Sequence, residues 1–175
     1  INYVSPNING FKLEAGLYDA GDWGAGVHYD NKIGAFKVRG RAFYESLTNS
    51  STSEGAWQVG GSVKHDSGIS LTGVYGQSLA VEGAEDDARW AATVGYTANL
   101  NALGPTGIGV NVSGSQDRTV VGSEAIAVGL GFNQQIKGAG TNIYGNVAFW
   151  DVDLPSSQTQ LDQVVTMLVG MQVKF

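Results

Sequence analysis

Three basic residues at every second position, Lys37, Arg39 and Arg41, form the clearest chemical pattern in this chain. Residues two apart lie on the same face of an extended strand, so these side chains form one basic ladder. Along a water-filled passage such a ladder selects ions through its electric field, whereas on a solvated surface it has no such role. We favour the passage, because no turn or helix cap explains the spacing.

Four further charged residues fall on polar strand faces with the same spacing: Lys12, Glu14, Lys64 and Arg89. Each of the three cations either extends the positive side of the passage or is scattered charge on a wet surface. Glu14 is expected to pair with Lys12 or with a residue on a neighbouring strand. The sequence therefore proposes seven pore-lining residues and leaves the surface alternative open for Lys12, Lys64 and Arg89.

Catalysis and metal binding find little support in the residue types. The chain has no cysteine and only two histidines, His28 and His65, so the common zinc sites lack ligands. A serine hydrolase needs its nucleophile on a strand-to-helix turn, and Ser78 lies within an expected strand and outside that motif. We expect no enzyme activity, no catalytic residue and structural roles for both histidines.

Acidic residues gather in several expected loops and offer the clustered oxygen ligands that Ca²⁺ prefers. They are Glu82, Glu85, Asp86, Asp87, Asp151 and Asp153. Ordinary loop solubility explains the same residues more simply. We therefore expect no cofactor and keep Ca²⁺ at these loops only as an alternative.

The composition restricts the class of protein. The formal net charge of −6 argues against binding of nucleic acid, which needs a basic face. Charged residues make up 15% of the chain, where about 25% is usual for soluble domains. No apolar run approaches the ~18 residues of a spanning helix. The start at Ile1 resembles neither an initiator nor a signal region, so we expect a removed targeting segment or a start within a longer protein.

Apolar residues recur at every second position along almost the whole chain, which predicts strands and no helix. We expect eleven strands, over residues 1–5, 11–19, 22–30, 35–45, 56–65, 69–79, 87–98, 106–116, 124–136, 141–151 and 163–175. Strand 141–151 is ambiguous, because both of its faces carry apolar residues.

The connections between these strands alternate in length. Short or glycine-rich turns are expected at 6–10, 31–34, 66–68, 99–105 and 137–140, and mostly longer connections at 20–21, 46–55, 80–86, 117–123 and 152–162. Short turns at one end and longer loops at the other are typical of an up-and-down barrel of the outer membrane.

Aromatic residues on the apolar faces fall near the strand ends, as in the two aromatic girdles of a membrane barrel. The expected loop-end girdle is Trp23, Tyr44, Trp57, Tyr75 and Trp90, and the turn-end girdle is Phe11, Tyr29, Phe36, Tyr96, Phe132 and Phe175. The alternative is a soluble or surface-displayed β-sandwich that binds a ligand, and a membrane-barrel enzyme is a third possibility. A sandwich would bury its aromatic residues centrally and expose more Lys and Glu.

Two segments resemble the Gram-negative general diffusion porins, specifically those of alphaproteobacterial type. The segment from Tyr3 through Ser5-Pro6 to Gly10-Phe11 is similar to a turn of that family that follows the loop folded into the pore. The alternating strand that ends at Phe175 is similar to the family's terminal assembly signal. Eleven strands also match what remains of a sixteen-stranded porin after the turn region before its sixth strand.

The resemblance implies a channel for passive diffusion of small hydrophilic solutes and ions across the outer membrane. It implies a homotrimer, contact with outer-membrane lipid and lipopolysaccharide, and recognition of the last strand by the barrel-assembly machinery. Residues 1–175 then form a single β-barrel domain without the N-terminal strands and the infolded constriction loop. Eleven is an odd number, whereas closed single-chain barrels have even strand numbers. Either the first five strands are absent from this sequence, or they belong to another chain, or the strand count is wrong and the chain is a complete ten- or twelve-stranded barrel.

Overall fold

The computed structural model describes residues 1–18, 21–48, 50–51, 53–118, 120–156, 158–159 and 163–173. Within these residues, eleven strands form one antiparallel sheet in which each strand pairs only with its neighbours in the sequence. The strands are β1 (Asn2–Val4), β2 (Phe11–Leu17), β3 (Trp23–Ile33), β4 (Phe36–Ser46), β5 (Ser53–His65), β6 (Ile69–Ala80), β7 (Asp87–Asn101), β8 (Gly104–Gln116), β9 (Glu124–Ile136), β10 (Thr141–Asp153) and β11 (Val164–Val173). The predicted up-and-down sheet is confirmed.

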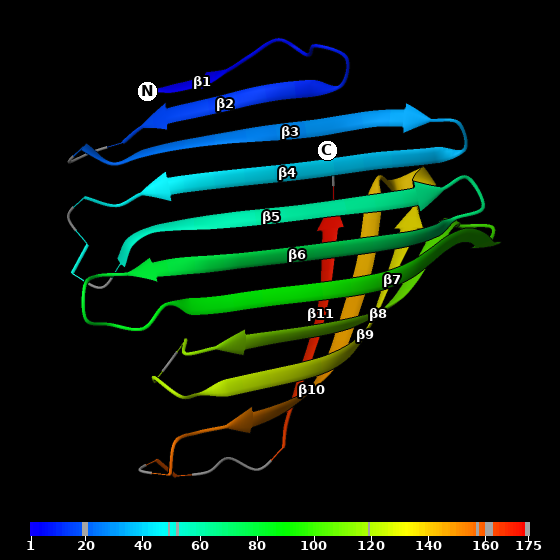
Figure 1. Cartoon of the computed structure of the whole chain (residues 1–175). Helices are drawn as coiled ribbons and strands as arrows, with labels where there is room; N and C mark the ends of the chain where they lie inside the picture. The colour runs from blue at the N-terminus through cyan, green and yellow to red at the C-terminus, as the bar shows by residue number, and fades with distance from the viewer. Residues whose placement is uncertain are drawn as a thin grey trace.

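The sheet is strongly curved. In Figure 1, β3 to β7 run across the view, while β8 to β11 turn away from their plane until β11 crosses them. No second sheet packs against either face in the described part of the chain. Ala127 and Ala148 are the only buried apolar residues in that part, which therefore has no hydrophobic core of large side chains. A soluble sandwich needs such a core between two packed sheets. The described residues form neither a second sheet nor such a core.

One face of the sheet, here called the apolar face, carries most of the large apolar side chains. The strand register aligns them in rows across the sheet, because directly paired residues point to the same side. One row runs from β6 to β11 through Leu71, Val94, Val110, Leu130, Val147 and Met167. Most of these side chains are exposed although they are apolar. The apolar face therefore suits a surrounding of hydrocarbon.

The opposite, polar face carries small and polar residues. On β8 and β9 it consists largely of Gly, Ala, Ser and Asn, as in the pairs Asn111 with Gly129 and Ser113 with Ala127. The charged residues of this face lie mainly on β2 to β5. Such an alternation of apolar and polar faces is what a wall between lipid and an aqueous channel requires.

The ambiguous strand β10 is resolved by its partners. Ile143 and Val147 pair with Met171 and Met167 of β11 and so belong to the apolar face. Its competing residues Tyr144, Ala148 and Trp150 lie on the polar face. There the indole nitrogen of Trp150 donates a hydrogen bond of 3.0 Å to Oγ1 of Thr166.

The two ends of the sheet differ, as expected from the sequence. The turn end has connections at 5–10, 34–35, 66–68, 102–103 and 137–140, the last including the short 3₁₀ helix η2 (Lys137–Ala139). The loop end has the connections 18–22, 47–52, 81–86, 117–123 and 154–163. In the described residues, no helix is long and apolar enough to cross a membrane.

Several strands are longer than their sequence pattern indicates. β3 continues to Ile33, and β7 and β8 extend into the expected turn 99–105, leaving only Ala102 and Leu103 between them. The β7–β8 register shifts between Ala98 and Asn101, and the Asn101 side chain accepts a hydrogen bond of 2.9 Å from the Leu103 amide. Polar residues here continue the backbone pairing of β7 and β8, so the turn is shorter than the sequence pattern indicates.

The face assignment predicts opposite effects for two adjacent residues of β8. Val110→Arg places a guanidinium on the apolar face, which costs about 2–4 kcal/mol at the midplane of a bilayer. Asn111→Arg is the matched control, because its side chain points to the polar face. We expect denaturant unfolding in lipid vesicles to show a loss of about 2–4 kcal/mol for the first variant and little change for the second. Equal losses would contradict the assignment.

Candidate functional site

The polar face brings all seven predicted charged residues to one side of the sheet. Lys37, Arg39 and Arg41 alternate along β4, and the register places Lys64 of β5 directly opposite Lys37. Lys12 and Glu14 lie on the same face of β2, and Arg89 lies further along the sheet on β7. We call Lys12, Lys37, Arg39, Arg41 and Lys64 the basic strip.

Two carboxylates neutralise part of the basic strip. Glu14 lies between Arg41 and His28, with Oε1 2.7 Å from Nη2 of Arg41 and Oε2 2.7 Å from Nε2 of His28. Asp30 accepts a hydrogen bond of 2.9 Å from Nε of Arg39, and its other oxygen lies 3.8 Å from Nζ of Lys37. Glu14 thus pairs with neighbouring strands and not with Lys12. Five cations against two carboxylates leave the strip positive.

The arginines keep free hydrogen-bond donors. Each guanidinium has five N–H groups, and the side chains of Arg39 and Arg41 are 58% and 50% exposed. Beside them lies a hollow of about 370 Å³ whose lining includes Gly60, Ser62 and Thr72. Guanidinium and hydroxyl donors around an open hollow attract anionic oxygens.

A row of lysines extends the positive charge to the turn end. Lys32 of β3, Lys37 of β4 and Lys64 of β5 are directly opposite one another across the three strands. Lys32 is bound by Asp66, with Nζ 3.0 Å from Oδ1, and Lys64 has no ion-pair partner among the described residues. Like charges in direct opposition repel one another, so this end of the polar face concentrates positive potential.

Sequence reasoning missed Lys32 and Asp30 as parts of this group. Both continue the two-residue period of His28 along β3, and Lys32 was lost because the predicted strand stopped at residue 30. His65 has a local role at the turn end. Its ring lies 4.9 Å from that of Phe36, and its Nδ1 lies 2.8 Å from Oγ of Ser67.

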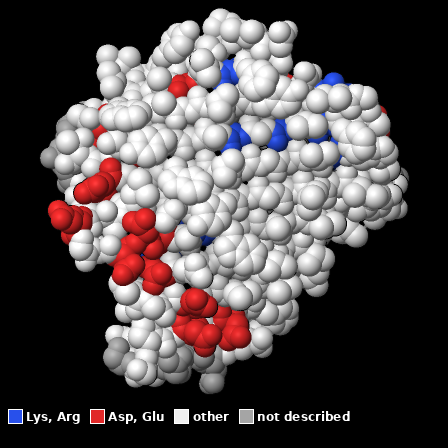
Figure 2. Space-filling model, viewed as in Figure 1, with Lys and Arg blue, Asp and Glu red and all other residues white. Residues whose placement is uncertain are grey.

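Acidic residues gather at the opposite end of the molecule. Figure 2 shows them along the edge where the longer loops lie, with a wide band between the two ends that is nearly free of acidic residues. They are Asp22, Glu45, Glu54, Glu82, Glu85, Asp86, Asp87, Asp117, Glu124, Asp151 and Asp153. No three potential metal ligands come together among the described residues, so the Ca²⁺ alternative gains no support.

The expected girdle residues lie on the apolar face near the strand ends. At the loop end, the rings of Trp23 and Tyr44 are 5.4 Å apart and those of Trp57 and Tyr75 are 5.3 Å apart. At the turn end, the ring of Phe11 lies 4.6 Å from that of Tyr29. The register places Trp90, Tyr96 and Phe132 on the same face. Phe175 lies outside the described residues.

Comparison with known proteins decides the family. A family model described as "Gram-negative porin" matches residues 1–153. The chain belongs to the Gram-negative porins. This confirms the resemblance to the Gram-negative porins, places the protein in the outer membrane, and favours a channel over an enzyme. The alphaproteobacterial type stays a prediction. The sequence matches no curated protein.

Two solved structures share the porin fold. An anion-selective porin from Comamonas acidovorans superposes with a TM-score of 0.60 at 18% sequence identity, covering 98% of this chain and 57% of that one. The outer-membrane protein OmpT of Vibrio cholerae superposes with a TM-score of 0.54 at 15% identity, covering 86% of this chain and 53% of that one. The chain thus spans little more than half the length of either structure.

The exposed apolar face of this porin predicts a strict dependence on detergent. Contiguous apolar surface of this extent associates in water, and no core in the described residues could hold the sheet together without a surrounding apolar phase. We expect size-exclusion chromatography to give one narrow peak in detergent and aggregates after detergent removal. A protein that stayed monodisperse in plain buffer would contradict a membrane-facing role for this surface.

Proposed function

We propose that this porin forms a water-filled outer-membrane channel for passive diffusion of small hydrophilic solutes and ions, with a preference for anions. The observation that carries the proposal is the division of one sheet into an apolar face and a polar face with a basic strip. The polar face then lines the lumen, where low-dielectric walls strengthen the field of fixed charges.

The anion preference rests on the imbalance between cations and carboxylates in the basic strip. Arg39 and Arg41 each have one nitrogen bound to a carboxylate and other N–H groups without a partner among the described residues, and both line the hollow that also includes Gly60. Lys12 and Lys64 have no carboxylate partner among the described residues. The anion-selective porin from Comamonas acidovorans shares the fold, which is compatible with this proposal and at 18% identity does not carry it.

The partners and the complete barrel belong to the same proposal. We propose a sixteen-stranded barrel in a homotrimer, with lipopolysaccharide and lipid around the apolar face. The barrel-assembly machinery would recognise the terminal strand, of which Val164–Val173 is described. The acidic loop end then faces outward from the cell and the turn end faces the periplasm. The aromatic residues near the two ends of the apolar face would mark the membrane interfaces.

Neutralising the basic ladder tests the anion preference. In the triple variant Lys37→Gln, Arg39→Gln and Arg41→Gln, the carboxylates of Glu14 and Asp30 remain without their main partners. A charge about 4 Å from a permeating ion contributes about 1 kcal/mol in water, or about fivefold in local concentration. We expect the barrel to stay folded and the ratio of anion to cation permeability, measured from planar-bilayer reversal potentials, to fall several-fold.

The single variant Glu14→Gln makes the opposite change in charge, because it removes the carboxylate that binds Arg41 and His28. It should move the selectivity toward anions, and its free energy of unfolding should change by less than about 1 kcal/mol because these ion pairs are partly solvated. Folded variants with the selectivity of the unchanged protein would rule out the lumenal role of the strip.

The orientation is tested with single cysteines in a chain that has none of its own. Ala84 lies exposed in the loop 81–86 and Ser67 lies exposed in the turn 66–68. We expect a bulky, membrane-impermeant thiol reagent to label Ala84→Cys in intact cells and to label Ser67→Cys only after the outer membrane is opened. The reverse pattern would invert the orientation.

A further inference from the structure

A second hollow opens on the polar face, closer to the loop end than the basic strip. Its volume is about 290 Å³, at the lower end of the range for small-molecule sites. Residues of β4 to β7 line it, among them the small residues Ala56 and Gly76 and the apolar residue Val74. Because Gly76 has no side chain, the space between β5 and β7 stays open.

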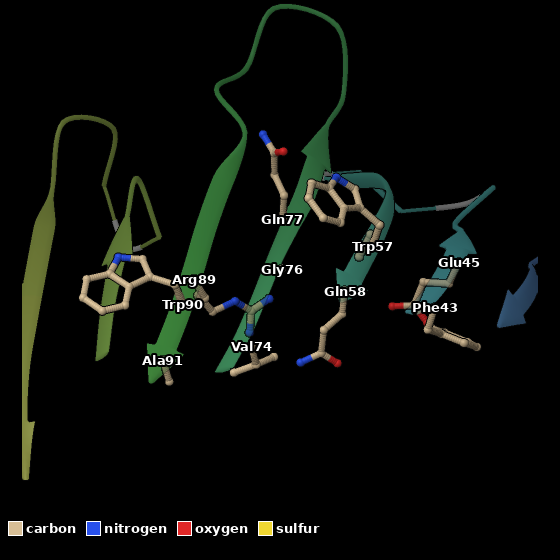
Figure 3. A pocket seen from close by; sticks show the side chains of 11 residues that line it. Phe43, Glu45, Trp57, Gln58, Val74, Gly76, Gln77, Arg89, Trp90 and Ala91 are labelled. Atoms are coloured by element: carbon tan, nitrogen blue, oxygen red, sulfur yellow. The ribbon is translucent and has the colours of Figure 1, made fainter. Parts of the chain in front are cut away.

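Opposite charges stand on the two sides of this hollow. Figure 3 shows the Arg89 side chain reaching from β7 over β6, the Glu45 carboxylate on β4, and the Gln58 amide of β5 between them. The register agrees, because Arg89, Gly76 and Gln58 lie in one row across the sheet and Glu45 belongs to the next row toward the loops. A ligand in the hollow meets a cation, an amide and an anion in that order.

Glu45 and Arg89 both have hydrogen-bonding groups without partners among the described residues. Glu45 is half-buried, and its carboxylate has no hydrogen-bond or ion-pair partner among the described residues. Arg89 is 47% exposed, lies 3.7 Å from Asp87 through Nε, and donates a hydrogen bond of 3.3 Å from Nη2 to Ser78. These contacts hold the Arg89 side chain and leave other N–H groups free. A carboxylate without a protein partner at the side of a hollow can accept hydrogen bonds from the cationic group of a ligand.

The charges decide which ligand fits. A simple anion gains from Arg89 and is repelled by Glu45, whereas a simple cation gains from Glu45 and is repelled by Arg89. A small zwitterion gains from both groups at once, with its carboxylate at the guanidinium and its ammonium at the carboxylate. The Gln58 amide can donate to the first and accept from the second.

We propose that Glu45, Gln58 and Arg89 form a binding subsite for small zwitterions of the free amino acid type on the lumenal wall. The proposal rests on the proposed function in that the polar face must line a passage that such solutes enter. It adds a selective step for net-neutral solutes to a wall whose basic strip acts on anions. Solutes that bind here are concentrated toward the loop end before they reach the strip.

Binding to the folded protein in detergent tests the subsite without requiring conduction. The probes are L-alanine and the ions with one of its charges removed, propionate and ethylammonium, titrated by ligand-observed NMR. We expect L-alanine to bind at least about fivefold more tightly than either ion, because it makes two charge-assisted contacts where each ion makes one. Equal binding of L-alanine and propionate, or no L-alanine binding to protein shown to be folded, would overturn the proposal.

Variants identify the residues. Glu45→Gln and Arg89→Gln should each weaken L-alanine binding by about fivefold, and the exchange Glu45→Arg with Arg89→Glu should restore part of it. Glu82→Gln removes an equal charge from an exposed loop residue outside the hollow and should change nothing. An effect of Arg89→Gln with none of Glu45→Gln would reduce the site to a plain anion site and overturn the proposal.

Conductance measurements on the same protein separate this inference from the proposed function. Binding without conductance would refute the channel and leave the zwitterion site standing. Conductance with anion preference but no L-alanine binding would refute the site and leave the channel standing.

Discussion

Satisfaction of backbone hydrogen bonds in a medium without water is the constraint on which this structure depends. Hydrocarbon offers no partner for an N–H or C=O group, so a wall of extended chain must pair every strand with a neighbour on each side. The meander does this for β2 to β10, because each of these strands pairs with the strands before and after it in the sequence. Pairing then fixes the register, and the register fixes which side chains share a face.

The two faces follow from the same pairing. A row such as Leu71, Val94, Val110 and Leu130 stays apolar across four strands because directly opposed residues point to one side. The same rule lines up Lys37 with Lys64 and places Glu14 within reach of Arg41 on the other side. Stability thus depends on an apolar surrounding, while the residues of the polar face are free to vary without disturbing a core.

Most of the fold and part of the site could be predicted from the sequence. The two-residue period locates the strands and assigns Arg39, Arg41 and Arg89 to the polar face, because period two is a local property of the chain. Partners across strands need the register, which local periodicity does not contain. The contacts of Glu14 with Arg41 and His28, and the hollow between Glu45 and Arg89, depend on the alignment of three or four strands. β10 was ambiguous for the same reason, since only its pairing with β9 and β11 separates Ile143 from Tyr144.

The strict sequence order of the strands has a consequence for how such a wall changes in evolution. Every strand between the two edges contacts only the strands before and after it, so a hairpin inserted or duplicated at a turn leaves the remaining pairs intact. The circumference of the barrel therefore grows in steps of two strands, and its lumen widens with each step. An insertion of one residue within a strand, in contrast, exchanges the two faces from that point to the next turn. Duplication of a hairpin therefore disturbs this fold less than the insertion of a single residue within a strand.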